Sequence, residues 1–341
     1  MSAIRRKTPW VHLATATAFL TSFGGGPSRA AEPGKLVLSC LEIPFYGRGV
    51  GLAIVIETPG GKVFLYDTGS GYPGKNGGDW SANYNAGRDA VLPFLKARGI
   101  PSIDGVLISH AHYDHFGGLM WLADHATVPK LIDSGYSFTP AHGDGLASEL
   151  ADYEALRARF RKVPGAYQAA HAGDHLDLDK ALDVAVISPP HSFFQANPKG
   201  RSPGDAPSHY LVNANSLGVR ITHGAVRILL PGDVQGTDQV ELLLPNIAAE
   251  TLRCDVLVAP AHGIDAQPEF ARATRPKVTI ASAGAKYAKG SPSPKVYGAV
   301  GSRVFVTGIH GQVTVTSDGR SFTVVAERPV AKVAAPELKN Q

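Results

Sequence analysis

The sequence predicts an α/β protein in which two β-sheets pack face to face and helices cover their outer faces. The chain has 341 residues, of which 44% are hydrophobic and 18% are charged, as in an ordinary globular protein. Short runs rich in β-branched residues recur along the chain, with helix-like segments between them. The order strand, turn, strand, aspartate occurs twice. This repetition indicates two similar halves, one for each sheet of a sandwich.

The first half combines strand-like runs with helix-like segments. Pro59-Gly60-Gly61 predicts a hairpin turn between two strands, and Gly99 with Pro101 predicts the end of a helix. A Gly/Asn-rich loop, residues 69–85, separates the hairpin from that helix. The expected strands are Leu36–Ile43, Gly51–Glu57, Lys62–Tyr66 and Val106–Ser109, and the expected helices are Arg88–Arg98, Gly117–His125 and Gly145–Lys162.

The second half repeats the hairpin, here around the turn His223-Gly224, and continues with further short strands. The Pro/Gly/Ser-rich stretch Pro189–Ser208 predicts a long surface loop, a kind of segment that often carries function. The expected strands are Val184–Ser188, Leu217–Thr222, Val226–Leu230, Val256–Ala259, Val278–Ser282, Val304–Thr307, Val313–Thr316 and Phe322–Ala326, and the last three form an all-β close.

Residues 1–31 differ from the rest of the chain. A basic head, a mildly apolar middle and a small-residue exit, Ser28-Arg29-Ala30-Ala31, are typical of a secretory signal peptide. We therefore expect a secreted or periplasmic protein whose mature chain has no membrane span. Cys40 and Cys254 are the two cysteines of the chain. In an exported protein they can form one disulfide, although the sequence leaves their pairing open.

The formal net charge of +4 comes from the leader. Residues 1–31 hold four basic residues, Arg5, Arg6, Lys7 and Arg29, and no acidic residue, so the remaining chain carries equal numbers of both. Tight binding to nucleic acid needs a basic surface, which neutralises backbone phosphates. The composition therefore gives no strong signal for nucleic-acid binding, and it leaves the oligomeric state open.

The strongest chemical signal is His110-Ala111-His112-Tyr113-Asp114-His115, which follows a short apolar strand. Imidazole and carboxylate are the usual ligands of catalytic zinc and related divalent ions. In an extended segment residues i and i+2 point the same way, so His110 and His112 can bind one ion. Asp114 and His115, in a turn before the helix, can then face a second ion.

Two further residues stand at equivalent strand ends in the second half. Asp233 follows one predicted strand and His262 follows the next. Two adjacent ions need roughly six protein ligands. These two residues bring the candidate set from four to six, which indicates a centre of two divalent metal ions, expected to be zinc.

At these residues the chain resembles the metallo-β-lactamase superfamily, whose signature is His-x-His-x-Asp-His. Leu65–Gly69 resembles its first motif, and Leu229–Asp233 resembles its Gly-Asp motif. The resemblance is greatest to the hydrolase domain of competence (ComEC-type) proteins, through Asn213–Leu217, Ala261-His262-Gly263 and Thr307–Gly311. It implies a four-layer αββα sandwich of the metallo-β-lactamase type, with residues 32–341 as a single hydrolase domain.

The resemblance also implies roles. His110 and His112 hold the first ion, Asp114, His115 and His262 the second, and Asp233 bridges both. Asp114 also orients the attacking water. Asp67 is expected to accept a hydrogen bond from the ring N–H of a metal ligand and so to fix its tautomer, or simply to form an Asp-Thr-Gly turn.

Three positions depart from the family pattern. The superfamily has a further histidine ligand between His115 and Asp233, and here the matching position holds Asn213. Asn213, His191 and His209 stay open as the third ligand of the first ion. Ala261 and Ser291 replace histidines of the competence-type pattern. A role for His310, and for Lys286 and Lys289 near an anionic substrate, also stays open.

The sequence thus predicts a metal-dependent hydrolase in which the ions lower the pKa of a bound water, so that hydroxide forms near neutral pH. The expected substrate is a phosphodiester, a nucleotide or another small molecule. One alternative is a hydrolase of carboxylic esters, lactones or β-lactams. The other is a non-catalytic binding protein that keeps the fold.

Overall fold

The computed structural model describes residues 31–44, 50–75, 77–137, 147–195 and 207–328, with side chains from 211 onward in the last range. The first 30 residues of the predicted leader, and most of the predicted loop Pro189–Ser208, lie outside this part. Among the described residues, no helix is long and apolar enough to cross a membrane.

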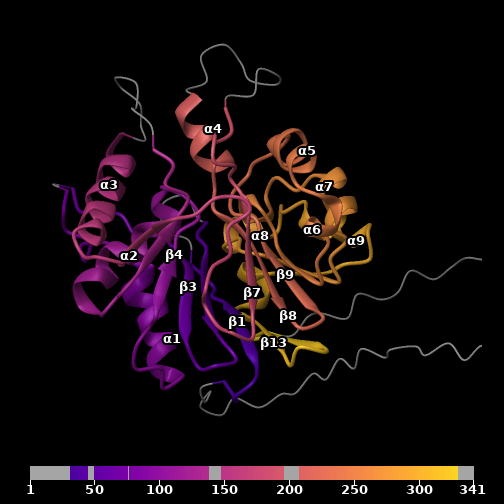
Figure 1. Ribbon diagram of the computed structural model, residues 1–341, viewed down its shortest axis with the longest axis horizontal. Coiled ribbons are helices and arrows are strands. Elements are labelled where there is room, and N and C mark those ends of the chain that lie inside the picture. Colours follow the sequence, from indigo (N-terminus) through magenta and orange to yellow (C-terminus); the bar gives the residue numbers. More distant parts are fainter. Residues whose placement is uncertain (1–30, 45–49, 76, 138–146, 196–206, 329–341) are drawn as a thin grey trace, which may run out of the picture.

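Two sheets form the centre of the molecule (Figure 1). Within the described residues, the first sheet has eight strands in the order β14-β13-β1-β2-β3-β4-β5-β6, and the second has six in the order β12-β11-β10-β9-β8-β7. The first sheet comprises β1 (Leu36–Cys40), β2 (Ala53–Glu57), β3 (Val63–Thr68), β4 (Gly105–Leu107), β5 (Leu131–Asp133), β6 (Tyr167–Ala169), β13 (Val313–Ser317) and β14 (Phe322–Ala326). The second comprises β7 (Asp183–Ser188), β8 (Gly218–His223), β9 (Val226–Leu230), β10 (Val256–Val258), β11 (Val278–Ala281) and β12 (Arg303–Val306).

Helices cover the outer face of each sheet (Figure 1). The first sheet carries the turn η1 (Gly87–Val91) with α1 (Leu92–Ala97), α2 (Tyr113–His125) and α3 (Ala147–Arg161). The second carries η2 (Gln239–Leu243), α5 (Leu244–Asn246), α6 (Ala249–Leu252), η3 (Ala261–Gly263), α7 (Pro268–Thr274), α8 (Ala285–Ala288), α9 (Ser293–Gly298) and α10 (Thr307–His310). Helix α4 (Pro207–Ala214) lies at the top of the molecule in this view.

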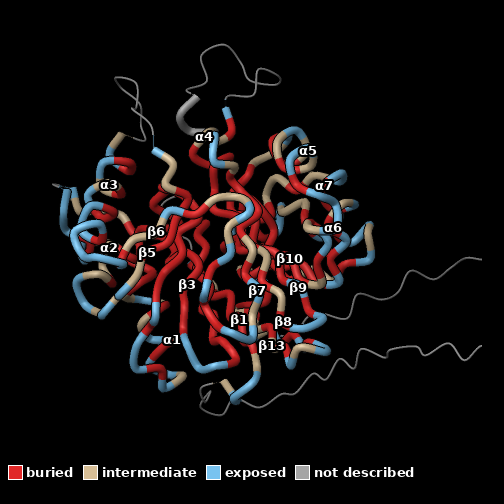
Figure 2. Tube along the Cα trace, in the orientation of Figure 1, coloured by how far each residue is buried: buried red, intermediate tan, exposed pale blue. Residues whose placement is uncertain are grey.

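Three separate hydrophobic clusters match the three interfaces of a four-layer sandwich. Alternate residues of β2 divide between two of them: Ile54 and Ile56 lie in the cluster between the sheets, whereas Ala53 and Val55 join the cluster under α1–α3. The third cluster lies between the second sheet and its helices. Buried residues accordingly fill the middle of Figure 2. The predicted four-layer αββα sandwich is confirmed.

The pairing of the strands also confirms the prediction that the chain consists of two similar halves, one for each sheet. β2 pairs antiparallel with β3, which pairs parallel with β4, and β8, β9 and β10 repeat this arrangement in the other sheet. The predicted all-β close is wrong in part. β12 joins the second sheet beside β11, residues 307–310 form α10, and β13 and β14 return to the first sheet.

Helix α2 begins four residues earlier than the predicted Gly117, so Asp114 and His115 lie in its first turn and not in a preceding turn. Glu149 Oε2 accepts the Tyr113 backbone N–H at 2.9 Å and thereby caps the early start. Gly118 lets the helix lie directly on the end of β3, because a Cβ there would be 2.1 Å from the Thr68 carbonyl oxygen.

Candidate metal centre

The candidate ligands follow three strands that end at one edge of the sandwich. His110, His112 and the first turn of α2 come after β4, Asp233 comes after β9, and His262 comes after β10. Parallel neighbours such as β9 and β10 bring their carboxyl ends to the same edge. All six predicted metal-binding residues (His110, His112, Asp114, His115, Asp233 and His262) are buried there.

The first pair consists of His110 and His112. His110 lies at a bend and not in an extended strand, yet its Nε2 atom is 2.9 Å from Nδ1 of His112. The two rings stand nearly at right angles, with their centroids 4.6 Å apart. Two imidazole nitrogens at this separation can bind a single ion together.

The second group brings together the two halves of the chain. His262 Nε2 lies 3.1 Å from Asp233 Oδ2, 3.2 Å from His115 Nε2 and 3.5 Å from Asp114 Oδ2. His115 Nε2 is also 3.3 Å from Asp233 Oδ2. Four donor atoms from three loops therefore face a common point.

The opposite nitrogen of each of these two imidazoles is already engaged. His262 Nδ1 donates to the Ser282 carbonyl oxygen at 3.1 Å, and His115 Nδ1 lies 2.7 Å from Asp67 Oδ2. Such a partner fixes the tautomer and the orientation of the ring, and leaves Nε2 able to bind an ion. Asp67 thus contacts a candidate ligand on the ring nitrogen that faces away from the cluster, which is one of the two roles that the sequence leaves open for it.

Ser109 is a site residue that sequence reasoning missed. Its backbone N–H and its hydroxyl each contact Asp67 at 2.7 Å, and its Oγ atom lies 2.9 Å from His110 Nδ1. It therefore joins the carboxylate behind His115 to the ring of His110. Its place immediately before the histidine motif was the only available signal.

The electrostatics of the cluster favour a bound cation. Burial raises the pKa of Asp114 and Asp233, but the neighbouring imidazoles outweigh it and hold both pKa values below their usual range. Burial lowers the pKa of His115 and His262, but Asp233 outweighs it, raising the pKa of His262 to about 9 and that of His115 well above its usual range. The buried carboxylates thus favour positive charge at this point, and a divalent ion can supply that charge, so the donor set fits a metal.

His110 behaves differently from the other two rings. Burial lowers its pKa well below the usual range, and the adjacent His115 and His112 rings add to that effect. A neutral imidazole is the form that binds metal, so His110 is ready to act as a ligand without losing a proton.

The pocket in front of the cluster also contains Asn213, which α4 carries at 1% exposure. Within the described part of the chain, neither Oδ1 nor Nδ2 of Asn213 has a hydrogen-bond partner. Leaving a buried amide unpaired costs roughly 1–3 kcal/mol per polar group. The position is therefore suited to a partner that the described residues do not supply.

Of the other open candidates for the third ligand, His191 lies elsewhere. The ring of His191 stacks on His171 with centroids 4.4 Å apart, and these two form a separate group with Asp174. The side chain of His209 lies outside the described residues. Among the three alternatives, the structure brings Asn213 to the pocket.

The remaining motif residues serve the fold. Ser291 Oγ donates to the Gly263 carbonyl oxygen at 2.8 Å and so holds the loop of His262. His310 is buried in α10, where its Nδ1 accepts the Val306 N–H at 2.8 Å. Cys40 and Cys254 are buried free thiols, so the structure contains no disulfide between them.

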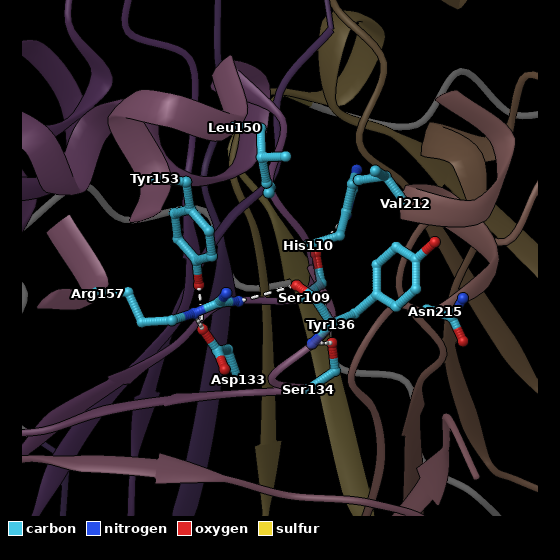
Figure 3. Close-up of a pocket in the computed structure, with 11 residues that line it drawn as sticks. Ser109, His110, Asp133, Ser134, Tyr136, Leu150, Tyr153, Arg157, Val212 and Asn215 are labelled. Atoms are coloured by element: carbon cyan, nitrogen blue, oxygen red, sulfur yellow. Dashed lines mark hydrogen bonds and ion pairs between the residues drawn. The ribbon is translucent and has the colours of Figure 1, made fainter. Parts of the chain in front are cut away.

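A second small pocket lies behind His110, between the strand ends, α3 and α4 (Figure 3). Its floor is a buried network in which Asp133 Oδ2 accepts from Tyr153 at 2.7 Å and pairs with Arg157 Nε at 2.8 Å. Both charged groups are about 2% exposed. Because the partners of the Arg157 guanidinium neutralise it, the network offers no free charge to a ligand. The network supports the loop that precedes the histidines.

A four-layer sandwich with buried imidazoles and carboxylates where both sheets end is the architecture of a metal-dependent hydrolase. The model of the Metallo-beta-lactamase superfamily matches residues 46–267, more than half of the chain. The chain therefore belongs to the metallo-beta-lactamase superfamily, and the predicted family and enzyme class are confirmed.

The chain is similar to several known proteins. It is 28% identical to ComE operon protein 3 of Bacillus subtilis over 73% of this chain and 29% of that protein. It is 28% identical to a UPF0173 metal-dependent hydrolase of Anaeromyxobacter dehalogenans over 54% of each. It thus spans less than a third of the first relative and about half of the second. The crystal structure of CmlA, a diiron beta-hydroxylase from Streptomyces venezuelae, aligns with a TM-score of 0.44 at 15% identity over 85% of this chain and 55% of that one.

Proposed function

We propose that this protein hydrolyses phosphodiester or nucleotide substrates at a centre of two divalent metal ions. The observation that carries the proposal is the convergence of donor atoms from both halves of the chain on one buried edge. His115, Asp233 and His262 place their facing atoms within 3.3 Å of one another. Buried carboxylates and imidazoles in such proximity serve to bind cations.

In this proposal His110, His112 and Asn213 would hold the first ion. Asp114, His115 and His262 would hold the second, and Asp233 would contribute to both. Zinc suits a set dominated by imidazole and carboxylate. The unpartnered Asn213 amide supports its inclusion, because binding an ion through Oδ1 satisfies a buried acceptor.

When bound, the ions lower the pKa of water and polarise the scissile bond of the substrate. The residues of the chain supply orientation. Asp114 faces the pocket and can accept a hydrogen bond from the attacking water, which aligns it with the substrate. Asn213 Nδ2 remains available to donate to a substrate oxygen.

The choice of a phosphodiester rests on the similarity to ComE operon protein 3 and on a cation beside the pocket. Tyr287 lines the pocket, and Lys286 Nζ lies 5.6 Å from the centroid of its ring. A lysine there suits an anionic substrate. The apolar wall formed by Val50, Ala261 and Ile264 instead favours carboxylic esters, lactones or β-lactams, the second candidate class.

The first experiment measures bound metal in the purified protein, together with hydrolysis of bis-p-nitrophenyl phosphate, a lactone and a chromogenic cephalosporin. We expect two ions per chain and preferential hydrolysis of the phosphodiester. Preference for the lactone or cephalosporin would favour the second class, and fewer than two ions without turnover would favour a non-catalytic binding protein.

A matched pair of variants tests the first ion site. Asn213→Ala should lose one of the two ions and most of the activity, since it removes a ligand. His191→Ala, which changes a residue of the separate group with His171, should retain both. Loss of an ion in His191→Ala and not in Asn213→Ala would contradict the assignment.

We also propose that the predicted N-terminal leader, residues 1–31, directs export and that the protein acts in a secreted or periplasmic location. The basic head, apolar middle and small-residue exit support this proposal. Fractionation of a Gram-negative host that produces the full chain tests it. Recovery of the protein in the cytoplasm alone would contradict export.

A further inference from the structure

The segment that follows the predicted leader is held on the β2–β3 hairpin at two points. The Ala31 nitrogen donates to Glu57 Oε2 at 2.8 Å, and the Gly34 nitrogen donates to the Pro59 carbonyl oxygen at 2.9 Å. The nearer carboxylate, that of Glu32, is instead paired with Lys35 at 2.6 Å. The chain is therefore fixed to the folded body from its residue 31 onward.

The acceptor at this point is a buried charge. Glu57 is the last residue of β2, its side chain is 4% exposed, and its other oxygen lies 2.5 Å from Arg98 Nη2. The Glu57 carboxylate already accepts a charge-assisted hydrogen bond from the backbone amide, and a positive charge on that nitrogen would add Coulomb attraction to the bond. A charged nitrogen at residue 31 would therefore suit Glu57 better than the backbone amide does.

The sequence indicates how such a charge can arise. Secretory leaders are cut after a small residue that has another small residue two positions before it. Ser28 and Ala30 meet this requirement for a cut before Ala31, whereas a cut after Ala31 would place Arg29 at the outer position.

We propose that the chain is cut between Ala30 and Ala31, and that the α-ammonium group so formed pairs with the Glu57 carboxylate. A signal peptidase adds water across the Ala30–Ala31 peptide bond. The carbonyl carbon leaves as the carboxylate of Ala30, and the nitrogen leaves as the amine of Ala31, which is protonated. Processing thus converts a neutral donor into a cation at a prepared anionic site, and it locks the new terminus on the hairpin.

The position of the cut is read from the intact mass of the protein recovered after export, so this part of the inference rests on the export proposed above. We expect the mass of residues 31–341. An Arg29→Lys variant, which keeps both small residues and a large residue at position 29, should give the same terminus, whereas Ala30→Leu should retain the leader. Any other terminus in the unaltered protein would overturn the inference.

The pairing is tested independently of export, on chains released from a cleavable tag. One chain begins at Ala31 and the other at Ser28, each with and without Glu57→Gln. We expect the free Ala31 amine to raise the melting temperature by about 2–4 °C when Glu57 is present, and by much less in Glu57→Gln. Glu42→Gln, which removes a carboxylate paired with Arg328 at 2.9 Å, should leave the gain intact. An equal gain in all backgrounds would overturn the pairing.

A second readout does not depend on stability. An amine-reactive reagent attacks only the unprotonated α-amine. The chain that begins at Ala31 should therefore react about tenfold faster when it carries Glu57→Gln, because one pKa unit corresponds to a factor of ten. Equal rates with and without the substitution would show that Glu57 does not hold the terminus.

Discussion

The two halves of the molecule use the same strand pattern for different chemical tasks. In each half an antiparallel hairpin is followed by a strand parallel to its second member, and polar residues follow both of the last two strands. Asp67 is the penultimate residue of β3, and Asp233 is the third residue after β9. Both aspartates lie near the carboxyl end of the second strand of a hairpin, yet they contact opposite sides of one ring.

That ring is His115. Asp67 Oδ2 lies 2.7 Å from its Nδ1 atom, and Asp233 Oδ2 lies 3.3 Å from its Nε2 atom. Asp67 adopts a left-handed backbone conformation, with φ of 55°, that turns its carboxylate back toward Ser109. The comparison teaches that the first half orients the His115 ring from its Nδ1 side through Asp67, whereas the second half places a carboxylate at its Nε2 side.

The largest effect should come from removing the carboxylate of the second half. Asp233→Ala leaves the His115 and His262 rings facing each other at 3.2 Å without their shared partner. We expect metal content and turnover to fall together by more than about 100-fold. This loss is larger than the one typical of residues that only orient a metal ligand. Metal analysis and hydrolysis assays measure both quantities, and full turnover by a metal-stripped protein would contradict the whole reading.

Asp67→Asn should give a smaller loss. The variant keeps the shape of the side chain but removes the charge that orients His115, which typically costs 10- to 100-fold in metal affinity or activity. Competition with a chromophoric chelator measures the affinity. Asp183→Asn, at a surface carboxylate paired with His175, is the control and should have no effect. A loss as large as that of Asp233→Ala would remove the distinction between the two halves.

Gly118→Ala tests how closely the first half packs its ligand-bearing helix. The new Cβ would meet the Thr68 carbonyl oxygen, a backbone atom that cannot move alone. We expect a loss of about 3 kcal/mol in the free energy of unfolding. Gly298→Ala, in α9 with open space around it, should be neutral or slightly stabilising. Denaturant unfolding compares the two variants, and equal stability would show that the helix can shift without cost.

The smallest effect concerns acid stability at the β2–β3 turn. Burial raises the pKa of Asp179, but hydrogen bonds from the Ala181 backbone, the Thr58 hydroxyl and the Gly60 backbone outweigh it and lower the pKa below 3.8. Its contribution to stability is therefore present above about pH 3.8 and is lost as the pH falls further. Asp179→Asn should be less stable near neutral pH and should show a shallower decline in acid. Melting temperatures across pH 2–7 test this, and parallel curves would contradict it.

The sequence predicted which residues converge better than it predicted the contacts that hold them. His110, His112 and Asp233 are recognisable because histidine and aspartate follow strand ends along the chain. Ser109 and the Asp133–Arg157 pair were missed, because their roles arise from contacts between segments far apart in sequence. No pattern of local spacing encodes such contacts.

The fold shows the same limit. Hairpins such as β2–β3 were found because a turn and alternating residues lie within one short window. β5 and β6, with the sequences Leu-Ile-Asp and Tyr-Gln-Ala, were missed because each is too short to show a period and contains a polar residue. β4 and β10 are equally short, but they contain no polar side chain and were recognised. The early start of α2 was missed because its cap, Glu149, comes from another helix.

The meeting of donors from both sheets has a thermodynamic consequence. Asp114 and His115 follow a strand of the first sheet, whereas Asp233 and His262 follow strands of the second. An ion bound between them would therefore link the two sheets. A ligand that binds only the folded chain stabilises it by about 4 kcal/mol at a thousand times its dissociation constant. The same residues that prepare the protein for hydrolysis would then tie its resistance to heat and proteolysis to the supply of metal in its surroundings.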